Sequence, residues 1–437
     1  MLRRLISDYP GFDAKLFIED EDPNLSSHVG GDTSNLGPNP KIRNLSRGYR
    51  EAKGDIVWIL DCNVWVGKGV AGRMVDKLCG FGPAGIRVKP YKFVHQLPIV
   101  VDSVGASAAE EARGLLAPRH DDDQAAGTAG YDISSDPKRE SEHSQALRTG
   151  GGRLEEMFMA STHAKFYTAI NTVGIAPCIV GKSNMFRRSH LDYLTSTLPS
   201  APKGIDFFSQ NICEDHLIGD LLWRKKVAEE EAGEKWGKHG FVFGDLAIQP
   251  MAGMSLRDYV ARRVRWLRVR KWTVTIATLV EPGVECFLCS AYASFALTTL
   301  PWFHHNVGVP QSWAAFALLW LLLVIAWFTV DRFVYAKLHS CASVELDPDT
   351  PSFARPPASR SRRPAKEWLV AWLGREILAL PIWTYAVLGG ATVVWRSKKF
   401  WVGMDMKVHE IKGNERSSTS TPEVESGHAS RSKDRRD

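Results

Sequence analysis

The hydrophobic positions follow one pattern up to about residue 270 and a different one beyond it. In the first part, apolar runs of strand length alternate with stretches of helical periodicity. The clearest run is IVWIL at 56–60, which is typical of a buried parallel strand and is followed at once by Asp61. A second strand is expected near 93–101. This alternation predicts an α/β domain over residues 1–270.

Further elements of this domain are indicated on either side of a stretch of different composition. Helical periodicity covers 154–170, a strand and then a helix are expected within 177–194, and a strand at 239–250 leads into a basic helix. Residues 102–152, in contrast, are rich in Ala, Gly, Asp and Ser. Such a segment cannot bury enough apolar surface to offset the entropy of ordering, so we expect a disordered insertion there.

Three long apolar segments follow residue 270. The segment 312–330 has 19 residues and no charge, which predicts a membrane-spanning helix. The segment 275–303 is long enough to span as well, although two glutamates and a proline lie near its start. The third, 367–395, is interrupted by an Arg–Glu pair and is expected to form an interfacial helix up to about Leu378 and then one span.

The predicted membrane region therefore covers 271–402, with two to three transmembrane helices and a polar, Pro-rich linker at 331–366. A disordered tail is expected over 403–437. The basic cluster before the first span and the basic linker after the second place the α/β domain in the cytosol by the positive-inside rule. The net charge of +6 is mild for 437 residues, and the seven cysteines show no zinc spacing.

Basic residues gather in one place, in the sequence ARRVRWLRVRK at 261–271. Such a run suits a nucleic-acid patch, a targeting signal, a membrane-surface helix or part of an active site. The apolar segments that follow it argue against a nucleic-acid partner. Its last three basic residues, Arg268, Arg270 and Lys271, are expected to hold the helix to anionic lipid headgroups.

Three short polar motifs stand out from the predicted elements. Asp61 and Asn63 form D-x-N at a strand end, where ligands of α/β sheets bind. Glu214 and Asp215 form an acidic pair that enters a helix, which by itself is more often a solvated helix start. Arginines and a tryptophan form R-x-x-R-W inside the basic run. Each motif alone is weak.

Together and in this order, the motifs resemble those of the membrane-attached inverting glycosyltransferases of the GT-A (Rossmann-like) fold. The chemistry is coherent, because a nucleotide-sugar carries a diphosphate leaving group that needs a divalent cation and cationic side chains. A separate carboxylate has to take the proton of the acceptor hydroxyl. Arg262 and Arg265 are three residues apart and share one helical face, with Trp266 beside them.

The resemblance sharpens to the ceramide glucosyltransferases, of fungal type. It rests on the blocks NPKIRNLSRGYREAKGDIVWILDCNVWV, FVHQLPIV, STHAKFY, CEDHLIGDLL, RRVRW, EPGVECF and AWLGREI. This family implies transfer of glucose from UDP-glucose to the primary hydroxyl of ceramide, with inversion, by a multi-pass protein of the Golgi (or ER) membrane whose catalytic domain faces the cytosol. The expected partners are UDP-glucose, ceramide and the lipid bilayer, and no nucleic acid.

The resemblance also assigns site residues. Asp215 is the expected general base, and Asp61 and Asn63 are the expected ligands of a divalent cation, magnesium or manganese. The remaining candidates are expected to bind substrate: Lys41, His163, Glu214, Arg262, Arg265 and Trp266. For His163 a purely structural role is equally compatible with the sequence.

Two departures from the family leave alternatives open. The family's N-terminal anchor and first acidic strand end would precede this chain's start, so the N-terminal part of the catalytic domain is expected to be missing. Asn63 also replaces the second carboxylate of the usual D-x-D, which lowers the expected metal affinity. Another membrane-bound UDP-sugar transferase, of the polysaccharide synthase kind, and an inactive truncated membrane protein are the alternatives.

Overall fold

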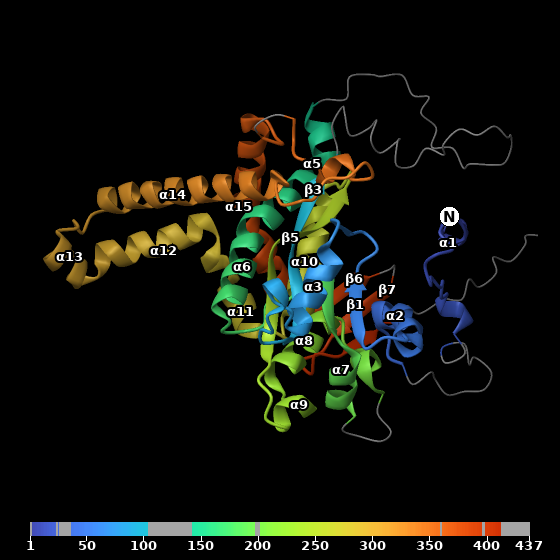
Figure 1. Ribbon diagram of the computed structural model, residues 1–437. Coiled ribbons are helices and arrows are strands. Elements are labelled where there is room, and N and C mark those ends of the chain that lie inside the picture. Colours follow the sequence, from blue (N-terminus) through green and yellow to red (C-terminus); the bar gives the residue numbers. More distant parts are fainter. Residues whose placement is uncertain are drawn as a thin grey trace, which may run out of the picture.

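The structure is a computed structural model that describes residues 2–22, 25, 36–103, 142–196, 202–358, 361–395 and 398–411 (Figure 1). Its centre is a mixed five-stranded sheet with the order β1-β4-β3-β5-β2. The strands are β1 (Ile56–Leu60), β2 (Trp65–Val66), β3 (Tyr91–Asp102), β4 (Ser183–Arg187) and β5 (Gly237–Met251). The α/β domain predicted from the sequence is thereby confirmed.

Strand β3 is the core of this sheet, and β1 lies at its edge. Every residue of β3 after Tyr91 is buried, and β3 runs parallel to β5 and antiparallel to β4. Strand β1 pairs antiparallel with β4 and with no other described strand, and most of its residues are half-buried. The prediction of a buried parallel strand at 56–60 was therefore right about the strand and wrong about its pairing and burial.

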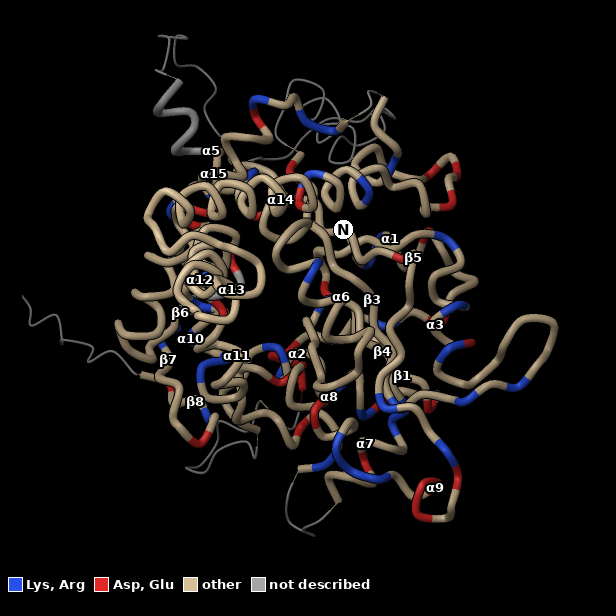
Figure 2. Tube along the Cα trace, turned by 90° about the vertical axis from the view of Figure 1, so that its left-hand side faces the viewer, with Lys and Arg blue, Asp and Glu red and all other residues tan. Residues whose placement is uncertain are grey.

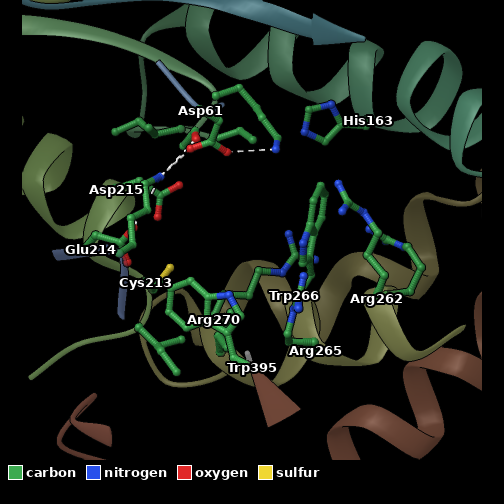
Figure 3. Close-up of a pocket in the computed structure, with 18 of the residues that line it drawn as sticks. Asp61, His163, Cys213, Glu214, Asp215, Arg262, Arg265, Trp266, Arg270 and Trp395 are labelled. Carbon is green, nitrogen blue, oxygen red and sulfur yellow. Dashed lines mark hydrogen bonds and ion pairs between the residues drawn. The ribbon is translucent and has the colours of Figure 1, made fainter. Parts of the chain in front are cut away.

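Helices cover both faces of the sheet. Helices α2 (Pro40–Glu51), α7 (Arg188–Thr195) and α8 (Glu214–Arg224) pack against β3 and β4 through one apolar cluster, and α3 (Val70–Cys79) packs on the opposite face. The short helical elements of this part of the chain are α1 (Leu2–Asp8), η1 (Glu19–Glu21), η2 (Pro83–Gly85), η4 (Gly204–Phe208) and α9 (Ala228–Glu231). The arrangement leaves the end of β1 and the start of α8 next to each other, as the close-up of Figure 3 shows.

One long helical rod crosses the domain. It consists of α5 (Glu142–Phe158), a five-residue π-helical turn η3 (Met159–His163) and α6 (Ala164–Val173). The helix predicted at 154–170 is confirmed, but the disordered insertion predicted over 102–152 is not correct at its ends. Asp102 belongs to β3 and α5 begins at Glu142, while 104–141 lie outside the described residues.

The chain then builds a helical hairpin that projects from the domain. After α10 (Leu256–Arg270), α11 (Thr275–Val280) and η5 (Glu281–Val284), the hairpin is formed by α12 (Cys286–Thr299), α13 (Pro301–Val307) and α14 (Trp313–His339) (Figure 1). No Lys, Arg, Asp or Glu occurs in α12 or α13, so both helices are drawn in tan in Figure 2.

Among the described residues, α14 is the single helix that is long and apolar enough to cross a membrane by itself. Helices α12 and α13, bent by 68° at their junction, would add a second span if the pair is counted as one. The third predicted span is not among the helices that are long and apolar enough to cross a membrane. Residues 367–395 form α15 (Ala365–Leu388), which packs along the domain, and then a strand. The predicted linker at 331–366 also starts too early, because α14 runs to His339.

The end of the described chain forms a small antiparallel sheet of β6 (Thr392–Trp395), β7 (Lys398–Val402) and β8 (Val408–Glu410). Its buried side chains pack on Ile212, which precedes α8, and on Val269 and Trp272 at the end of α10. The disordered tail predicted from 403 is thus wrong for residues up to Glu410, and 412–437 lie outside the described residues.

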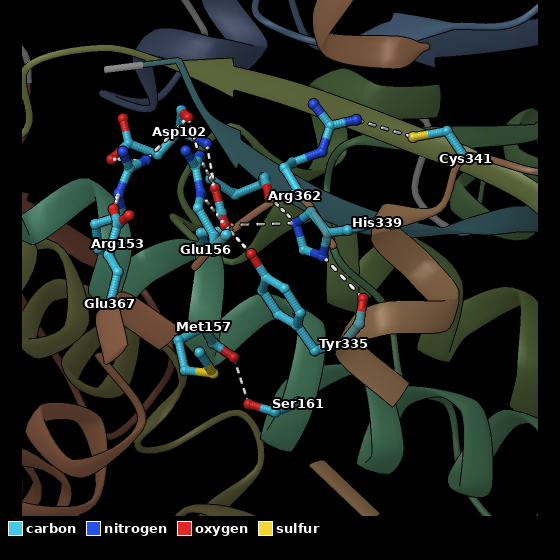
Figure 4. Close-up of polar contacts among 12 residues, drawn as sticks. Asp102, Arg153, Glu156, Met157, Ser161, Tyr335, His339, Cys341, Arg362 and Glu367 are labelled. Carbon is cyan, nitrogen blue, oxygen red and sulfur yellow. Dashed lines mark hydrogen bonds and ion pairs between the residues drawn. The ribbon is translucent and has the colours of Figure 1, made fainter. Parts of the chain in front are cut away.

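Polar groups join the hairpin to the domain at two buried points. Asp331 of α14 bonds Lys165 of α6, and it accepts hydrogen bonds from Trp372 Nε1 at 2.9 Å and from Arg375 at 3.0 Å. Glu156 of α5 forms the second point (Figure 4). Its carboxylate lies 2.7 Å from Arg363 and from the backbone nitrogen of Asp102, and it accepts a short bond from Tyr335 of α14.

Candidate active site

A cavity of about 350 Å³ lies between the end of β1, the start of α8 and helix α10 (Figure 3). Every site residue predicted from the sequence lines it, so the structure brings together predicted side chains from five stretches of the chain. These residues are Lys41, Asp61, Asn63, His163, Glu214, Asp215, Arg262, Arg265 and Trp266. Further lining residues that the sequence did not assign to the site include Phe158, Gly181, Lys182, Cys213, Arg270 and Trp395.

Asp61 lies directly beyond β1, and two lysines hold its carboxylate. Its Oδ1 atom is 3.0 Å from Lys41 Nζ and its Oδ2 atom is 2.9 Å from Lys182 Nζ, as the dashed lines of Figure 3 show. Lys182 Nζ also donates to Asn63 Oδ1 at 3.4 Å. Burial alone would raise the pKa of Asp61, but the two ammonium groups outweigh it and hold the pKa below its ordinary value.

Lys41 reaches Asp61 because of the way α2 begins. Asn39 is the N-cap of this helix, and its side-chain oxygen accepts from the backbone nitrogens of Lys41 and Ile42 at 2.8 and 3.2 Å. Pro40 suits the first helical position, where no backbone N–H is needed. The cap fixes Lys41 in the first turn, with its ammonium group also 3.6 Å from Glu214.

Glu214 and Asp215 begin α8 and face different surroundings. Glu214 is only 4% exposed and accepts from Asn39 Nδ2 at 2.9 Å, so the pair is not the solvated helix start that a lone E-D motif suggests. Burial raises the pKa of Glu214 to about 7, helped by Asp215 and opposed by Lys41. The carboxylate of Asp215 points into the cavity (Figure 3).

A glycine allows this close assembly. A Cβ atom on Gly181 would lie 2.9 Å from both Asp215 Oδ2 and Lys41 Nζ, closer than a side chain tolerates. A larger residue at 181 would push the ends of the Asp215 and Lys41 side chains out of their present places, so glycine keeps this assembly close.

Helix α10 supplies the cationic wall. Ser255 and Asp258 form a capping box at its start, which fixes where the helix begins. Arg262 is 2.8 Å from Glu155, and its guanidinium lies 4.8 Å from the ring centre of Trp266. Arg265 makes no ion pair with any described residue, and burial followed by the charge of Arg262 lowers its pKa. Arg265 is thus a cation in the cavity wall whose charge no described carboxylate neutralises.

Arg268, Arg270 and Lys271 bond to groups of the protein itself, which corrects the expectation that they hold the helix to lipid headgroups. Arg268 donates to the carbonyl oxygens of Thr392 and Gly389 at 2.7 and 3.0 Å, and Lys271 to that of Val387 at 2.6 Å. The bonds to Val387 and Gly389 satisfy carbonyls that the end of α15 leaves without intrahelical partners. Arg270 is inside the cavity wall and pairs with Glu281.

His163 ends the π-helical turn and lines the cavity. Its ring lies parallel to that of Tyr167, with 5.3 Å between centres, and its Nδ1 atom is buried with no hydrogen-bond partner among the described residues. Burial, and then the charges of Arg263 and Arg270, lower its pKa to about 3. The imidazole is therefore neutral at physiological pH and acts in the cavity as a polar, uncharged group.

The oxygens of Asp61 and Asn63 are of the kind that magnesium and manganese prefer. In this arrangement, however, the ammonium group of Lys182 lies between them, and the part of the chain that the structure describes has no cluster of three or more His, Cys, Asp or Glu placed to hold a metal. The donor set fits a divalent cation only once Lys182 has moved away.

Carboxylates facing an array of cations at the edge of a mixed sheet are the features expected of a glycosyltransferase. The sequence profile of the family described as Glycosyl transferase family 21 matches residues 1–117 and 143–408. The chain belongs to this family.

Proteins with similar sequences carry a more specific name, ceramide glucosyltransferase. The chain is 54% identical over 423 residues to a ceramide glucosyltransferase of Pyricularia oryzae, covering 94% of this chain and 76% of that protein. It is 48% identical over 452 residues to a ceramide glucosyltransferase of Gibberella zeae, covering 100% of this chain and 81% of that protein. A ceramide glucosyltransferase of Candida albicans is 29% identical, with 94% and 79% covered. The resemblance drawn from the motifs is confirmed.

Proposed function

We propose that this protein transfers glucose from UDP-glucose to the primary hydroxyl of ceramide, with inversion, in a catalytic domain of the GT-A kind. The observation that carries the proposal is the identity of about half of all residues with two proteins named ceramide glucosyltransferase. The cavity supports it, because one wall offers a carboxylate and the other offers cations.

The side chains divide the reaction between them. Asp215 takes the proton of the acceptor hydroxyl as that oxygen attacks the anomeric carbon, and the bond to the diphosphate breaks on the opposite side of the sugar. Arg265, which has no described carboxylate partner, binds the departing diphosphate together with Arg262. Trp266 and the neutral His163 line the same space and help to position the substrates.

A divalent cation, magnesium or manganese, belongs to this proposal. Asp61 and Asn63 would hold it, and when bound it would neutralise charge on the diphosphate. Lys41 remains beside Asp61 and supplies a fixed positive charge at the same end of the cavity.

We infer that the protein is a multi-pass membrane protein of the Golgi or ER with its catalytic domain in the cytosol, and the apolar hairpin supports the membrane association in this proposal. Helix α14 and the bent pair α12–α13 would form the spans. Helix α15 presents an exposed apolar stripe at helical spacing, at Val370, Leu373, Ile377, Leu380 and Leu388, and would lie in the membrane interface. Ceramide would then reach the cavity from the bilayer without crossing an aqueous phase.

The test is Asp215→Asn in the full chain, assayed in membranes with UDP-glucose and defined ceramides in the presence of Mg²⁺ or Mn²⁺. The variant is expected to lose activity by a factor of about 10² to 10⁴, because the amide cannot take a proton. Asp220→Asn on the same helix, which removes a surface pair with Arg224, should keep wild-type activity. An active Asp215→Asn variant would refute the base, and polymeric product from the wild type would favour a polysaccharide synthase.

A further inference from the structure

Two ammonium groups share the carboxylate of Asp61, but they are held differently. Lys41 Nζ also donates to the carbonyl oxygen of Gly181 at 3.2 Å and lies 3.6 Å from Glu214, so it is fixed from several sides. Lys182 Nζ contacts Asp61 at 2.9 Å and Asn63 at 3.4 Å, which are the two oxygens of the D-x-N motif. Its side chain is only 10% exposed.

This position is the one that a cation bridging Asp61 and Asn63 would take. An ammonium group supplies one positive charge there and binds through hydrogen bonds, whereas a divalent ion would bind the same two oxygens directly. The two cations cannot occupy the place together, because both would need the same oxygen atoms and would repel each other at contact distance.

We propose that Lys182 is a tethered counter-ion that occupies the cation position between Asp61 and Asn63 when no donor is bound, and that it leaves this position as the nucleotide diphosphate enters. This inference rests on the cation and the donor of the proposed function. It assigns Lys182 as a positioning residue that couples binding of the nucleotide to binding of the metal.

The coupling follows from charge. Without a nucleotide, a divalent ion has to displace a buried ammonium group that has no other described anion within ion-pair distance. A diphosphate gives Lys182 an alternative anionic partner inside the same cavity, so the D-x-N oxygens become free as the ligand arrives. Metal and nucleotide therefore bind cooperatively, and by thermodynamic reciprocity each raises the affinity for the other by the same factor.

The experiment measures binding of Mn²⁺ to the purified full chain in lipid nanodiscs, by electron paramagnetic resonance of the free ion, with and without UDP. The wild type is expected to bind Mn²⁺ weakly alone and about tenfold or more tightly with UDP, within the usual range of coupling between two sites. Lys182→Met keeps the length of the side chain without its charge. It should bind Mn²⁺ about tenfold more tightly than the wild type in the absence of UDP, and UDP should then add little.

Three controls make the result specific. Lys182→Arg keeps the charge and Lys203→Met removes an exposed one, so both should bind Mn²⁺ as the wild type does. Adding Asp61→Asn to Lys182→Met should abolish the gained affinity. The proposal is overturned if Lys182→Met binds Mn²⁺ no better than the wild type, or if the double variant keeps the gain. The binding experiment does not depend on turnover, so a gain of Mn²⁺ affinity in Lys182→Met, together with no ceramide glucosylation by the wild type in the separate membrane assay, would count against the proposed function alone.

Discussion

At the scale of single residues, the adjacent carboxylates of Glu214 and Asp215 have been given separate environments. Glu214 is turned into the protein, against Asn39 and Lys41, while Asp215 faces the cavity. Neighbouring titratable groups in unlike surroundings are a common way to separate chemical roles. Glu214 holds a proton up to neutral pH, and it thereby limits the negative charge beside the proposed base.

This arrangement predicts how stability depends on pH. Glu214 has an ordinary pKa of 4.5 and a folded-state pKa of about 7, so its contribution to the free energy of unfolding is complete below 4.5 and is lost as the pH rises through 7. The loss amounts to at most about 3 kcal/mol. The melting temperature of the wild type should fall between about pH 4.5 and 7 and then level off, and Glu214→Gln should flatten this fall. Glu234→Gln, at an exposed site, should leave the slope unchanged, and an equal slope in Glu214→Gln would contradict the prediction.

Sequence motifs located the predicted site residues because each lies at a recognisable boundary, such as Asp61 after a strand or Glu214 at a helix start. Lys182 gave no such signal. It lies in a loop before β4, 121 positions after Asp61 along the chain. Its contact with Asp61 depends on the pairing of β4 with β1. Arg270 was misassigned for the opposite reason. Its spacing suited a membrane-facing helix, whereas in the fold it pairs with Glu281 of η5 and lines the cavity.

At the scale of elements, the segment before α15 is more than a linker. Arg363 bonds both the Glu156 carboxylate of α5 and the Asp102 carbonyl at the end of β3, and Tyr335 of α14 also bonds Glu156. Glu156 is 1% exposed, and burial would raise its pKa, but Arg363 and His339 lower it to about 2. One carboxylate thus joins the sheet, the long rod and the hairpin.

Removal of the ion pair between Arg363 and Glu156 should lower the free energy of unfolding much more than removal of a surface ion pair. Arg363→Met leaves Glu156 with an uncompensated buried charge, so the free energy of unfolding should fall by about 3–5 kcal/mol. Arg224→Met, whose partner Asp220 is on the surface, should cost less than about 1 kcal/mol. Thermal unfolding of both variants in nanodiscs measures the difference. Equal melting temperatures would show that the Glu156 cluster does not hold the elements together.

The pattern of apolar positions predicted most elements but not every type of pairing. An apolar run of five residues such as IVWIL is compatible with a parallel or an antiparallel strand, because its neighbours in the sheet come from distant parts of the chain. For the same reason, TVVW at 392–395 was taken as the end of a span, although it pairs with β7 and packs on Ile212. The helical start of α5 was missed because its composition is polar.

At the scale of the whole molecule, the apolar hairpin projects from a charged catalytic domain (Figure 1), and α15 presents an exposed apolar stripe. Leu321 and Ile325 of α14 lie on one helical face and are about half exposed. A charge near the centre of a spanning helix costs about 2.5–3.5 kcal/mol. Leu321→Arg with Ile325→Arg should therefore release a large fraction of the protein from membranes on alkaline carbonate extraction. Leu346→Arg, outside the helix, should stay in the pellet, and full retention of the double variant would argue against insertion of α14.

The π-helical turn Met159–His163 has a consequence for how the rod works as one piece. Each residue of an α-helix advances about 100° around the axis. The wider turn shifts the phase of everything after it, so that His163 faces the cavity while Lys165 meets Asp331 of α14 and Tyr167 bonds His95 of β3. Deleting one residue of this turn would rotate the later side chains by about that angle and break both contacts. The π-helical turn therefore sets the rotation about the rod axis that lets one rod contact both the cavity and α14 of the hairpin.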